Sequence, residues 1–575
     1  MILLRLKINE PFRCLQAGFE LYFQNDWDRS ESCGGFAPYV LAGPNGSGKS
    51  NVLEALAAIF YHLQCQYLTI RPQGFDYDEE ENPGGFRDER SVPDAFELEY
   101  LTFPPVSPEY GDEKILVHIR IVKVPGSSAR VYLLNHPDVD ADTPLPRTEA
   151  AEMLPEHVIA YSSGENEILS LPFFKMRFIN YDAYLYHLTR QSDYPEPEGR
   201  MTFLDSQMSQ ALLICNFLFQ DESSLEPFKT DVGVEGLKQF RIIIRQHRRV
   251  EYNVELLEEF ERSRTEFPFG TEVELTSAFK KNVQREDGSV RKIGIIDRLT
   301  QCATCSFFDG QTDSLVLDYW VTPETRTAFK NHFSSILDLF QSFQALITLN
   351  LYPVSDAMKK ALYRSASLYV NETVPILPLD ERVIRFEDLI LLKEGVTAPV
   401  YAKSLSDGEH QFLHTLGLCL LFKNKNALFL LDEPETHFNP DWRSKLISRI
   451  RDCFGMSYRK TKREMLITTH TPFLISDSRP ENVLVFKKED QSVTVSRPDY
   501  NTLGASINKI TMKTFGKKET IGGYAESILE TLKKRFAAGE DREALLEEVH
   551  QKLGDSIEKM LFTKTLLDSM EKEET

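Results

Sequence analysis

A glycine-rich segment near the amino terminus combines residue types that bind phosphate. Residues 43–50 read Gly-Pro-Asn-Gly-Ser-Gly-Lys-Ser, which fits the pattern GxxxxGK[ST]. Glycines let the backbone curl until successive N–H groups point at an anion, and a following helix adds its positive N-terminal end. The Lys49 amine would meet the β- and γ-phosphates, and the Ser50 hydroxyl would bind Mg²⁺. We therefore predict that ATP and Mg²⁺ bind here, with the nucleotide contacted by Gly43, Asn45, Gly46, Ser47, Gly48, Lys49, Ser50 and Asn51.

A second candidate segment is an apolar run that ends in two carboxylates. Residues 427–431 read Ala-Leu-Phe-Leu-Leu and are followed by Asp432 and Glu433. A wholly apolar run is typical of a central parallel strand that is buried on both faces. At the end of such a strand, Asp432 would belong to the Mg²⁺ shell together with Ser50. Glu433 would act as the catalytic base that polarises the attacking water.

Two further segments could complete a phosphate site. Ser406 and Glu409 have the spacing of a capping box, which predicts that a helix begins here. The start of that helix, with the Ser406 hydroxyl and the Gly408 N–H, would offer a second phosphate-binding surface. Residues 465–469 are typical of a buried strand, and His470 follows them directly. A histidine in that place can contact the γ-phosphate, so we predict a catalytic role for it.

The segments around these motifs predict an α/β nucleotide-binding fold. A short apolar run at 39–42 precedes the glycine-rich loop, and residues 51–63 have helical character. Strand, loop and helix in this order begin an α/β unit. Further strands are predicted at 2–8, 18–23, 95–103, 114–123 and 157–161.

The middle of the chain is less regular than its two ends. No heptad repeat persists there, so no long coiled coil is expected. Helices are predicted near 206–220, 254–265, 325–346 and 356–368. We expect four parts: residues 1–180 and 385–524 as the two halves of one nucleotide-binding head, residues 181–384 as an inserted helix-rich lobe, and residues 525–575 as a helical, polar tail that frays.

Composition narrows the class of protein. The chain has 575 residues, 42% of them hydrophobic, which is enough for a large core. The net charge of −21 argues against a protein that coats DNA in general. Eight scattered cysteines indicate a reducing compartment rather than a disulfide scaffold. No apolar stretch is long enough to span a bilayer and no signal-peptide pattern is present, so we expect a cytoplasmic protein without membrane contact.

Two weaker features have more ordinary interpretations. Arg241, Arg245 and Arg249 would share one face of a helix. A solvated, salt-bridged face is favoured there over a track for a nucleic-acid backbone. Cys302 and Cys305 have the spacing of half a zinc site, but no second Cys or His pair follows closely, so structural cysteines are favoured.

Taken together, the motifs resemble those of the ABC/SMC-like ATPase heads of the AAA family. Residues 405–411 (Leu-Ser-Asp-Gly-Glu-His-Gln) resemble the ABC signature, and residues 428–435 resemble the Walker B motif with its glutamate. His470 matches the switch histidine, and residues 4–13 resemble the opening strand of the RecF, SMC and Rad50 group. The resemblance implies an α/β, ABC-type head, in which helices flank a central mixed sheet that both ends of the chain assemble.

In that family, two heads enclose two nucleotides between them. The resemblance implies a homo-oligomer, either a head-to-head dimer or a higher assembly of dimers. In such an assembly, Ser406, Gly408 and Glu409 of one subunit would act on the ATP held by Lys49 of another. His410 departs from the family pattern, which has Arg or Lys there.

The overall layout resembles the ATPase subunits (PtuA) of Septu anti-phage defence systems, and the resemblance includes residues 501–523. It implies an HNH endonuclease (PtuB-like) as the partner that cuts, regulated by this chain, with DNA contacted through the complex. The alternative is a RecF-like repair or recombination ATPase that binds DNA without a nuclease partner. A third alternative is a nucleotide-binding module with negligible turnover. A nuclease of the overcoming-lysogenization-defect type is disfavoured, because the segment after His470 is short and has no paired-aspartate metal motif.

Overall fold

The computed structural model describes most of the chain, and the structural statements below concern the described residues. These are residues 1–23, 36–72, 74–104, 116–136, 139–164, 166–189, 200–245, 247–251, 272–276, 280–284, 290–365, 367–455, 461–490, 492–516 and 521–574.

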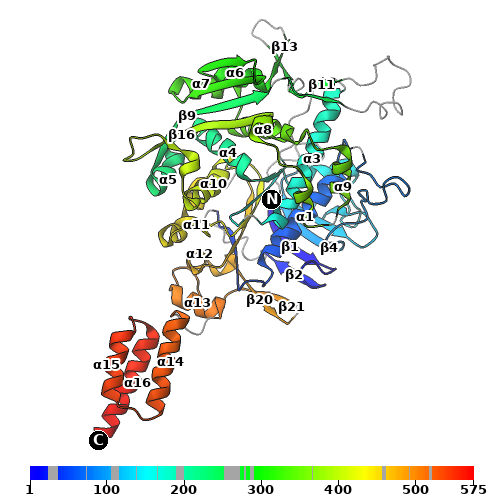
Figure 1. Cartoon of the computed structure of the whole chain (residues 1–575). Coiled ribbons are helices and arrows are strands. Elements are labelled where there is room, and N and C mark those ends of the chain that lie inside the picture. The colour runs from blue at the N-terminus through cyan, green and yellow to red at the C-terminus, as the bar shows by residue number, and fades with distance from the viewer. Residues whose placement is uncertain are drawn as a thin grey trace.

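A seven-stranded sheet lies at the centre of the fold (Figure 1). Its order is β21 (Ser492–Ser496), β20 (Val483–Glu489), β3 (Tyr39–Ala42), β19 (Arg463–Thr469), β18 (Ala427–Asp432), β7 (His157–Ser162) and β8 (Met201–Phe203). Every neighbouring pair is parallel except β20 and β21, which are antiparallel. Strands from the two ends of the chain therefore alternate in one mixed sheet, and the predicted fold class is confirmed.

The central strands are apolar throughout because both faces of the sheet are covered. Successive side chains of a strand point to opposite faces. On β18, Leu428 and Leu430 enter one core, whereas Phe429 and Leu431 enter another. The first core is shared with α1 (Lys49–Gln66), and the second with α4 (Ser206–Phe219), α10 (Asp407–Leu421), α11 (Pro440–Phe454) and α12 (Pro472–Ser476).

A second sheet is antiparallel and covers α1 from the other side. Its order is β2 (Phe19–Tyr22), β1 (Ile2–Ile8), β4 (Phe96–Thr102), β5 (Val117–Lys123) and β6 (Arg130–Leu133). Leu6 of β1 pairs with Leu98 of β4 and both are buried, whereas the outward-facing Arg5 bonds to Glu20 and Glu99. This alternation of apolar and charged residues is the pattern that predicted these strands.

The inserted region contains helices, as predicted, and also contributes strands to a further sheet. The antiparallel order is β14 (Cys305–Asp309), β15 (Ser314–Trp320), β9 (Val234–Arg245), β16 (Ile384–Lys393) and β17 (Val400–Tyr401). Two short two-stranded sheets are antiparallel: β10 (Arg249–Glu251) pairs with β11 (Glu272–Glu274), and β12 (Lys280–Gln284) pairs with β13 (Val290–Gly294). The lobe therefore contains β-strands beside its helices, and its sheet also includes β16 and β17, which lie almost wholly in the segment predicted as the second half of the head.

The helices of the N-terminal half and the lobe match the predicted segments in part. The segment predicted at 325–346 is two helices, because Ser335 caps a new helix by accepting the N–H of Asp338. The helix predicted at 254–265 lies outside the described residues. The helices are α2 (Arg147–Glu152), α3 (Glu167–Thr189), α4, α5 (Glu222–Val232), α6 (Ile295–Cys302), α7 (Pro323–His332), α8 (Ile336–Thr348) and α9 (Asp356–Arg364), of which α3 extends across residue 180.

The predicted helical face of arginines is wrong. Arg241 and Arg245 lie on strand β9, and Arg249 begins β10. The run of β-branched residues at 242–244 favours a strand, and its burial decides the matter. Arg241 pairs with Asp318 of the neighbouring strand, with Nε 2.6 Å from Oδ1. Arg241 therefore forms an ion pair between two strands of the sheet, as the salt-bridged interpretation expected.

The C-terminal tail was expected to fray, but it forms helices that pack against one another. After α13 (Ile507–Phe515), three helices project from the rest of the molecule (Figure 1): α14 (Gly523–Ala537), α15 (Arg542–Lys552) and α16 (Ile557–Glu574). Leu529, Leu545, Val549 and Leu566 form a core that belongs to these helices alone. The apolar residues that stabilise it are diluted by charged ones, which is why composition suggested a polar terminus.

Among the described residues, we found no helix with both the length and the apolar character needed to cross a membrane.

Candidate nucleotide site

The glycine-rich loop lies between β3 and α1, and two of its glycines are required by its geometry. Gly43 has a φ of 151°, and a Cβ there would lie 2.4 Å from the carbonyl oxygen of Phe486. Gly48 has a φ of 98°, and a Cβ there would lie 3.0 Å from Cys14 Sγ. A side chain at either position would strain the backbone; at Gly43 it would also collide with a backbone oxygen, and at Gly48 it would crowd the Cys14 side chain. The tip of the loop, Asn45 and Gly46, is exposed.

Lys49 begins α1 and its amine is held inside the loop. Its Nζ donates to the carbonyl oxygens of Gly43 and Pro44, both at 3.0 Å, and lies 3.5 Å from His470 Nδ1. Burial lowers the pKa of this amine to about 8, although the nearby Glu433 and Asp432 act in the opposite direction. Burial thus destabilises the charged form of Lys49, at the place where the predicted phosphates would stabilise it.

Asp432 is the meeting point of four elements. Its Oδ1 accepts hydrogen bonds from Ser50 Oγ at 2.8 Å and Thr468 Oγ1 at 2.6 Å, and its Oδ2 accepts from Asn166 Nδ2 at 2.9 Å. These partners come from α1, β19 and the turn after β7. Each oxygen of the carboxylate is therefore oriented, and its contact with Ser50 is the pair predicted for a metal shell.

Glu433 adopts an uncommon backbone conformation, with a φ of 49°. Its N–H donates to Thr468 Oγ1 at 3.0 Å, and its carbonyl accepts from Ser163 Oγ and from Thr436 Oγ1 at 2.9 Å. A non-glycine residue in this region is strained and persists only where its surroundings fix it. The hydrogen bonds to the N–H and to the carbonyl oxygen of Glu433 supply that restraint.

The side chain of Glu433 pairs with His470, Oε1 to Nε2. The hydrogen bond from His470 and the charges of His470 and Lys49 lower the pKa of this carboxyl despite its partial burial. A carboxylate that stays ionised can orient and polarise a water molecule. The arrangement brings together the two residues predicted to be catalytic.

The strand register explains why these residues meet. Asp432 lies opposite Thr468 of β19 and Ser162 of β7, and Thr469 lies opposite Ala42 of β3. The carboxyl ends of parallel strands share one edge of the sheet, and ligands of open α/β sheets bind there. The loop after β3, the carboxylates after β18 and the histidine after β19 are therefore neighbours.

The residues present fit ATP and Mg²⁺. Mg²⁺ prefers oxygen ligands, and the carboxylate of Asp432 and the hydroxyl of Ser50 converge at the start of α1. The loop backbone forms a cradle that only glycine permits at Gly43 and Gly48. The Ser47 hydroxyl is buried without a hydrogen-bond partner among the described residues. Asn51, by contrast, is engaged within the fold, because its Nδ2 donates to Glu54 at 3.0 Å.

The predicted signature segment begins α10 with the expected cap. Ser406 Oγ accepts the N–H of Glu409 at 3.4 Å, and Glu409 Oε2 accepts the N–H of Ser406 at 2.7 Å. Glu409 also pairs with Lys393 of β16. A Cβ on Gly408 would lie 2.7 Å from the carbonyl oxygen of His437, so only glycine lets this helix end approach the turn after β18. Ser406 is exposed, and its hydroxyl bonds within the cap.

Gln411, on the next turn of α10, connects this helix to the nucleotide site. Its Oε1 accepts the N–H of His437 at 3.1 Å, and its Nε2 donates to the carbonyl oxygen of Ser163 at 3.5 Å. Ser163 in turn contacts the carbonyl of Glu433. A continuous set of hydrogen bonds therefore runs from the signature helix to the predicted base.

Sequence reasoning missed Asn166, Ser163 and Thr468. The signal for the first two was present, since a polar Ser-Ser-Gly turn follows an apolar strand at 157–161, but no motif assigned it a role. Thr468 belongs to the strand predicted at 465–469, and only its hydrogen bond to Asp432 places it at the candidate site.

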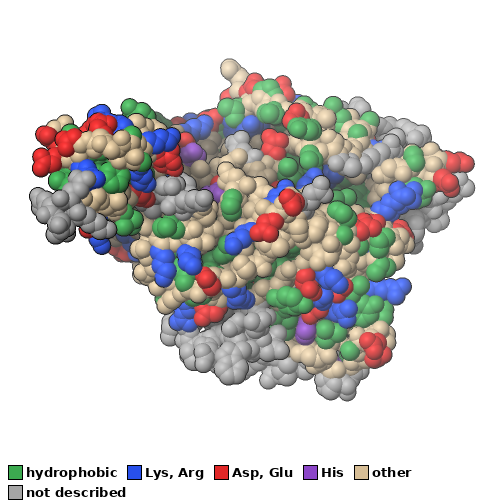
Figure 2. Space-filling view, turned by 90° about the horizontal axis from the view of Figure 1, so that it is seen from below, with side chains coloured by type: hydrophobic (Ala, Val, Ile, Leu, Met, Phe, Trp, Pro, Cys, Tyr) green, Lys and Arg blue, Asp and Glu red, His purple; other side chains and the backbone are tan. Residues whose placement is uncertain are grey.

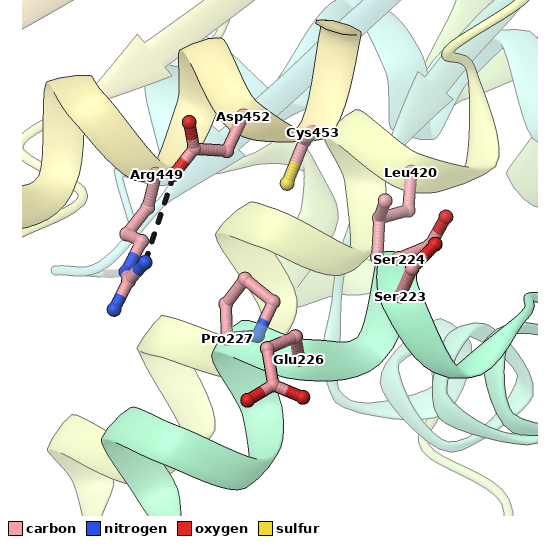
Figure 3. A pocket seen from close by; sticks show the side chains of 8 residues that line it. All are labelled: Ser223, Ser224, Glu226, Pro227, Leu420, Arg449, Asp452 and Cys453. Carbon is pink, nitrogen blue, oxygen red and sulfur yellow. Dashed lines mark ion pairs between the residues drawn. The ribbon is translucent and has the colours of Figure 1, made fainter.

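A separate cavity of about 230 Å³ lies between α5, α10 and α11 (Figure 3). Pro227 and Leu420 form apolar walls, and Arg449 pairs with Asp452 at its side. None of the residues that line it contributes to the predicted nucleotide site. Among the described residues, no group of three or more His, Cys, Asp or Glu side chains could hold a metal ion, and this includes the surroundings of Cys302 and Cys305.

Comparison with known families finds a match in two separated segments. Residues 39–100 and 317–476 match the family described as AAA domain, putative AbiEii toxin, Type IV TA system. The segments include the glycine-rich loop, Asp432, Glu433 and His470. The match to this AAA-domain model is thus split between two segments that lie far apart in the sequence.

Other similarities are distant. A stretch of 124 residues is 23% identical to protein ea59 of Escherichia phage lambda, and it spans 22% of this chain and 23% of that protein. Among solved structures, an SMC head bound to the C-winged helix domain of ScpA aligns over 86% of this chain and 98% of its own, with 10% identity and a TM-score of 0.34. The SMC head domain from Thermotoga maritima aligns over 87% and 100%, with 10% identity and a TM-score of 0.30.

Proposed function

We propose that this chain binds ATP with Mg²⁺ and hydrolyses it, with Glu433 as the base and His470 beside the γ-phosphate. The observation that carries the proposal is the convergence of Lys49, Ser50, Asp432, Glu433 and His470 at the carboxyl edge of three neighbouring strands. Mg²⁺ bound at Ser50 and Asp432 would neutralise phosphate charge. Lys49 binds the phosphates, and Glu433 receives the proton of the attacking water.

A second copy of the chain completes each site in this proposal. Ser406 is exposed at the N-terminus of α10, where free N–H groups and the helix dipole favour an anion. Its hydroxyl bonds to Glu409 of the same cap, and in this proposal it would exchange that contact for a neighbour's nucleotide. Hydrogen bonds from Gln411 to Ser163 and from Ser163 to Glu433 connect this helix end to the proposed base. Pairing of two subunits and hydrolysis are thereby linked.

The first experiment compares ATP turnover and mass in solution for the wild type, Glu433→Gln and Lys49→Ala. Glu433→Gln should bind ATP, accumulate as a dimer and hydrolyse at least about 100-fold more slowly, because a positioned general base contributes that much. Lys49→Ala should lose ATP binding and remain unpaired. Turnover of Glu433→Gln close to that of the wild type would refute the catalytic assignment.

We also propose that the ATPase regulates an HNH endonuclease in an anti-phage defence complex of the Septu type. The support is the layout of the head motifs and of residues 501–523, which resembles that of PtuA subunits. In this proposal the cutting residues belong to the partner chain, and DNA is contacted through the complex. The nucleotide-dependent pairing of heads then changes how the partner is held.

Affinity purification of tagged Glu433→Gln from its own host, with ATP and Mg²⁺, tests this proposal. The expected result is a small HNH protein in a fixed ratio to the ATPase by mass spectrometry. The matched control is Lys49→Ala, which should retain less of the partner if pairing governs its binding. Recovery of repair factors and DNA without any nuclease would favour the RecF-like alternative.

The charge distribution favours the nuclease-partner proposal over direct coating of DNA. The chain has a net charge of −21. On the face seen in Figure 2, acidic and basic side chains are interspersed. A protein that neutralises several phosphates shows binding that falls steeply with salt. Strong, salt-dependent DNA binding by the purified chain alone would therefore support the alternative.

A further inference from the structure

Glu435 is a buried carboxylic acid close to the proposed base. It lies in the turn two residues after Glu433, and only 1% of its surface is exposed. Its Oε1 accepts a hydrogen bond from Thr469 Oγ1, while its Oε2 has no hydrogen-bond partner among the described residues. A buried carboxyl with one unsatisfied oxygen destabilises a fold. Its presence therefore requires an explanation.

The hydrogen-bond partner of Glu435 is the residue next to His470 in the chain. Thr469 is the last residue of β19 and directly precedes His470. Its hydroxyl donates to Glu435 and also accepts the N–H of Thr471 at 3.0 Å. One hydroxyl thus connects the residues on both sides of His470 to the turn after β18. Two hydrogen bonds therefore restrain the backbone on either side of His470, and both depend on the orientation of the Thr469 hydroxyl.

The turn that carries Glu435 is itself anchored. Arg443 of α11 donates from Nε to the carbonyl oxygen of Glu435 at 3.3 Å and from Nη2 to that of Thr436 at 2.8 Å. Thr436 also bonds to the carbonyl of Glu433. Glu433 and Glu435 therefore lie on one turn that these hydrogen bonds hold together. A contact from this turn to Thr469 fixes the distance between the two halves of the Glu433–His470 pair.

We propose that Glu435 is a positioning residue of the ATPase: through the Thr469 hydroxyl, its carboxyl holds His470 in contact with Glu433. This inference rests on the proposed function and deepens it, because it names a residue that acts on the catalytic pair without touching the nucleotide. Glu435 thereby aligns His470, the first residue of the segment between β19 and α12. Without the hold, His470 loses the alignment that keeps Glu433 oriented.

The charges around Glu435 are consistent with this role. Burial raises the pKa of Glu435 to about 7 and the charge of Glu433 acts in the same direction, while the Thr469 hydrogen bond and Arg443 oppose them. The role needs an oxygen that accepts the Thr469 hydroxyl, and a glutamine provides one at the same place. Glu435→Gln is therefore the conservative variant, and Glu435→Ala removes the acceptor.

Steady-state ATP turnover of the full chain tests the inference. Glu435→Ala and Thr469→Val should each lower kcat by about tenfold, a loss of about 1.4 kcal/mol in transition-state stabilisation, with KM for ATP within about twofold. Glu435→Gln should keep kcat within about threefold of the wild type. The double variant should be no slower than either single one, because both changes remove the same contact.

Glu464 provides a matched control for a purely structural effect. It is also a buried carboxyl on β19, but at the opposite end, where Oε2 accepts the N–H of Leu3 at 3.1 Å. Glu464→Gln should lower the thermal midpoint without changing kcat. Thermal midpoints and nucleotide binding are measured for every variant, so that a loss of fold is distinguished from a loss of alignment.

The outcomes separate the inference from the function on which it rests. Unchanged kcat in Glu435→Ala, or a glutamine variant as slow as the alanine one, would overturn the positioning role. A fall in kcat matched by Glu464→Gln at equal loss of stability would overturn it as well. Absence of Lys49-dependent turnover in the wild type would instead refute the proposed function, and this inference with it.

Discussion

At the scale of single residues, the site is dominated by the cost of holding charged groups out of water. Lys49 is a buried cation whose pKa is lowered to about 8, and its partners are carbonyl oxygens as well as distant carboxylates. A triphosphate placed against this amine would stabilise its charged form. Binding of the nucleotide and protonation of Lys49 are therefore coupled.

This coupling predicts that ATP affinity depends on pH. Below about pH 8 the amine is protonated in both free and bound states, so affinity is constant. Above that value the free amine is neutral and binding must take up a proton, so affinity should fall by up to about tenfold per pH unit. Nucleotide titrations between pH 7 and 9.5 in several buffers measure it. Lys49→Arg should remove the dependence, since arginine stays charged, and a slope that survives this change would exclude Lys49 as its source.

At the scale of elements, the contact between β16 and α10 joins the inserted lobe to the signature helix. Lys393 lies on a strand that pairs with β9 of the lobe, and its amine pairs with Glu409 in the helix cap. This chain has histidine at 410, where the ABC signature that it resembles has arginine or lysine. Lys393 thus places a cation beside the cap from a different element. The lobe thus has a direct connection to the helix end that, in the proposed function, would contact a second copy.

A substitution at this contact should uncouple the lobe from hydrolysis. Lys393→Met keeps the length of the side chain and removes its charge, so it should lower ATP turnover by about three- to tenfold, the scale of one partly buried ion pair. ATP binding to the unpaired subunit should be unchanged, and Lys393→Arg should restore turnover. Lys445→Met is the control, because Lys445 pairs with Asp441 on the exposed surface of α11. Equal effects at positions 393 and 445 would contradict the coupling.

At the scale of the whole molecule, two large cores meet at the central sheet and a third core lies apart. The sheet cannot form from either end of the chain alone, because β3 from the N-terminal part lies between β20 and β19 from the C-terminal part. The lobe in between shares one of the two large cores. The three C-terminal helices have their own core. The body that contains the candidate nucleotide site is therefore assembled from distant segments, whereas the C-terminal helices are a separate packing unit.

Local sequence determined the parts of this protein whose physics is local. The glycine-rich loop needs backbone conformations that only glycine adopts freely, and Ser406 with Glu409 makes a cap within one turn of helix. The apolar run before Asp432 could only be a buried strand. These features predicted the fold class and the residues of the candidate site, because each depends on neighbours within a few positions.

The tertiary structure decided what depends on contacts between distant segments. The arginine-rich segment at 241–249 had helical spacing, yet the β-branched residues among them pair with two other strands. Asn166 became part of the site only because β7 lies beside β18. The buried pair of Glu435 and Thr469, and the core of the C-terminal helices, likewise arise from packing. The order of the strands, and the choice of distant segments that pack together, are set by the whole chain at once.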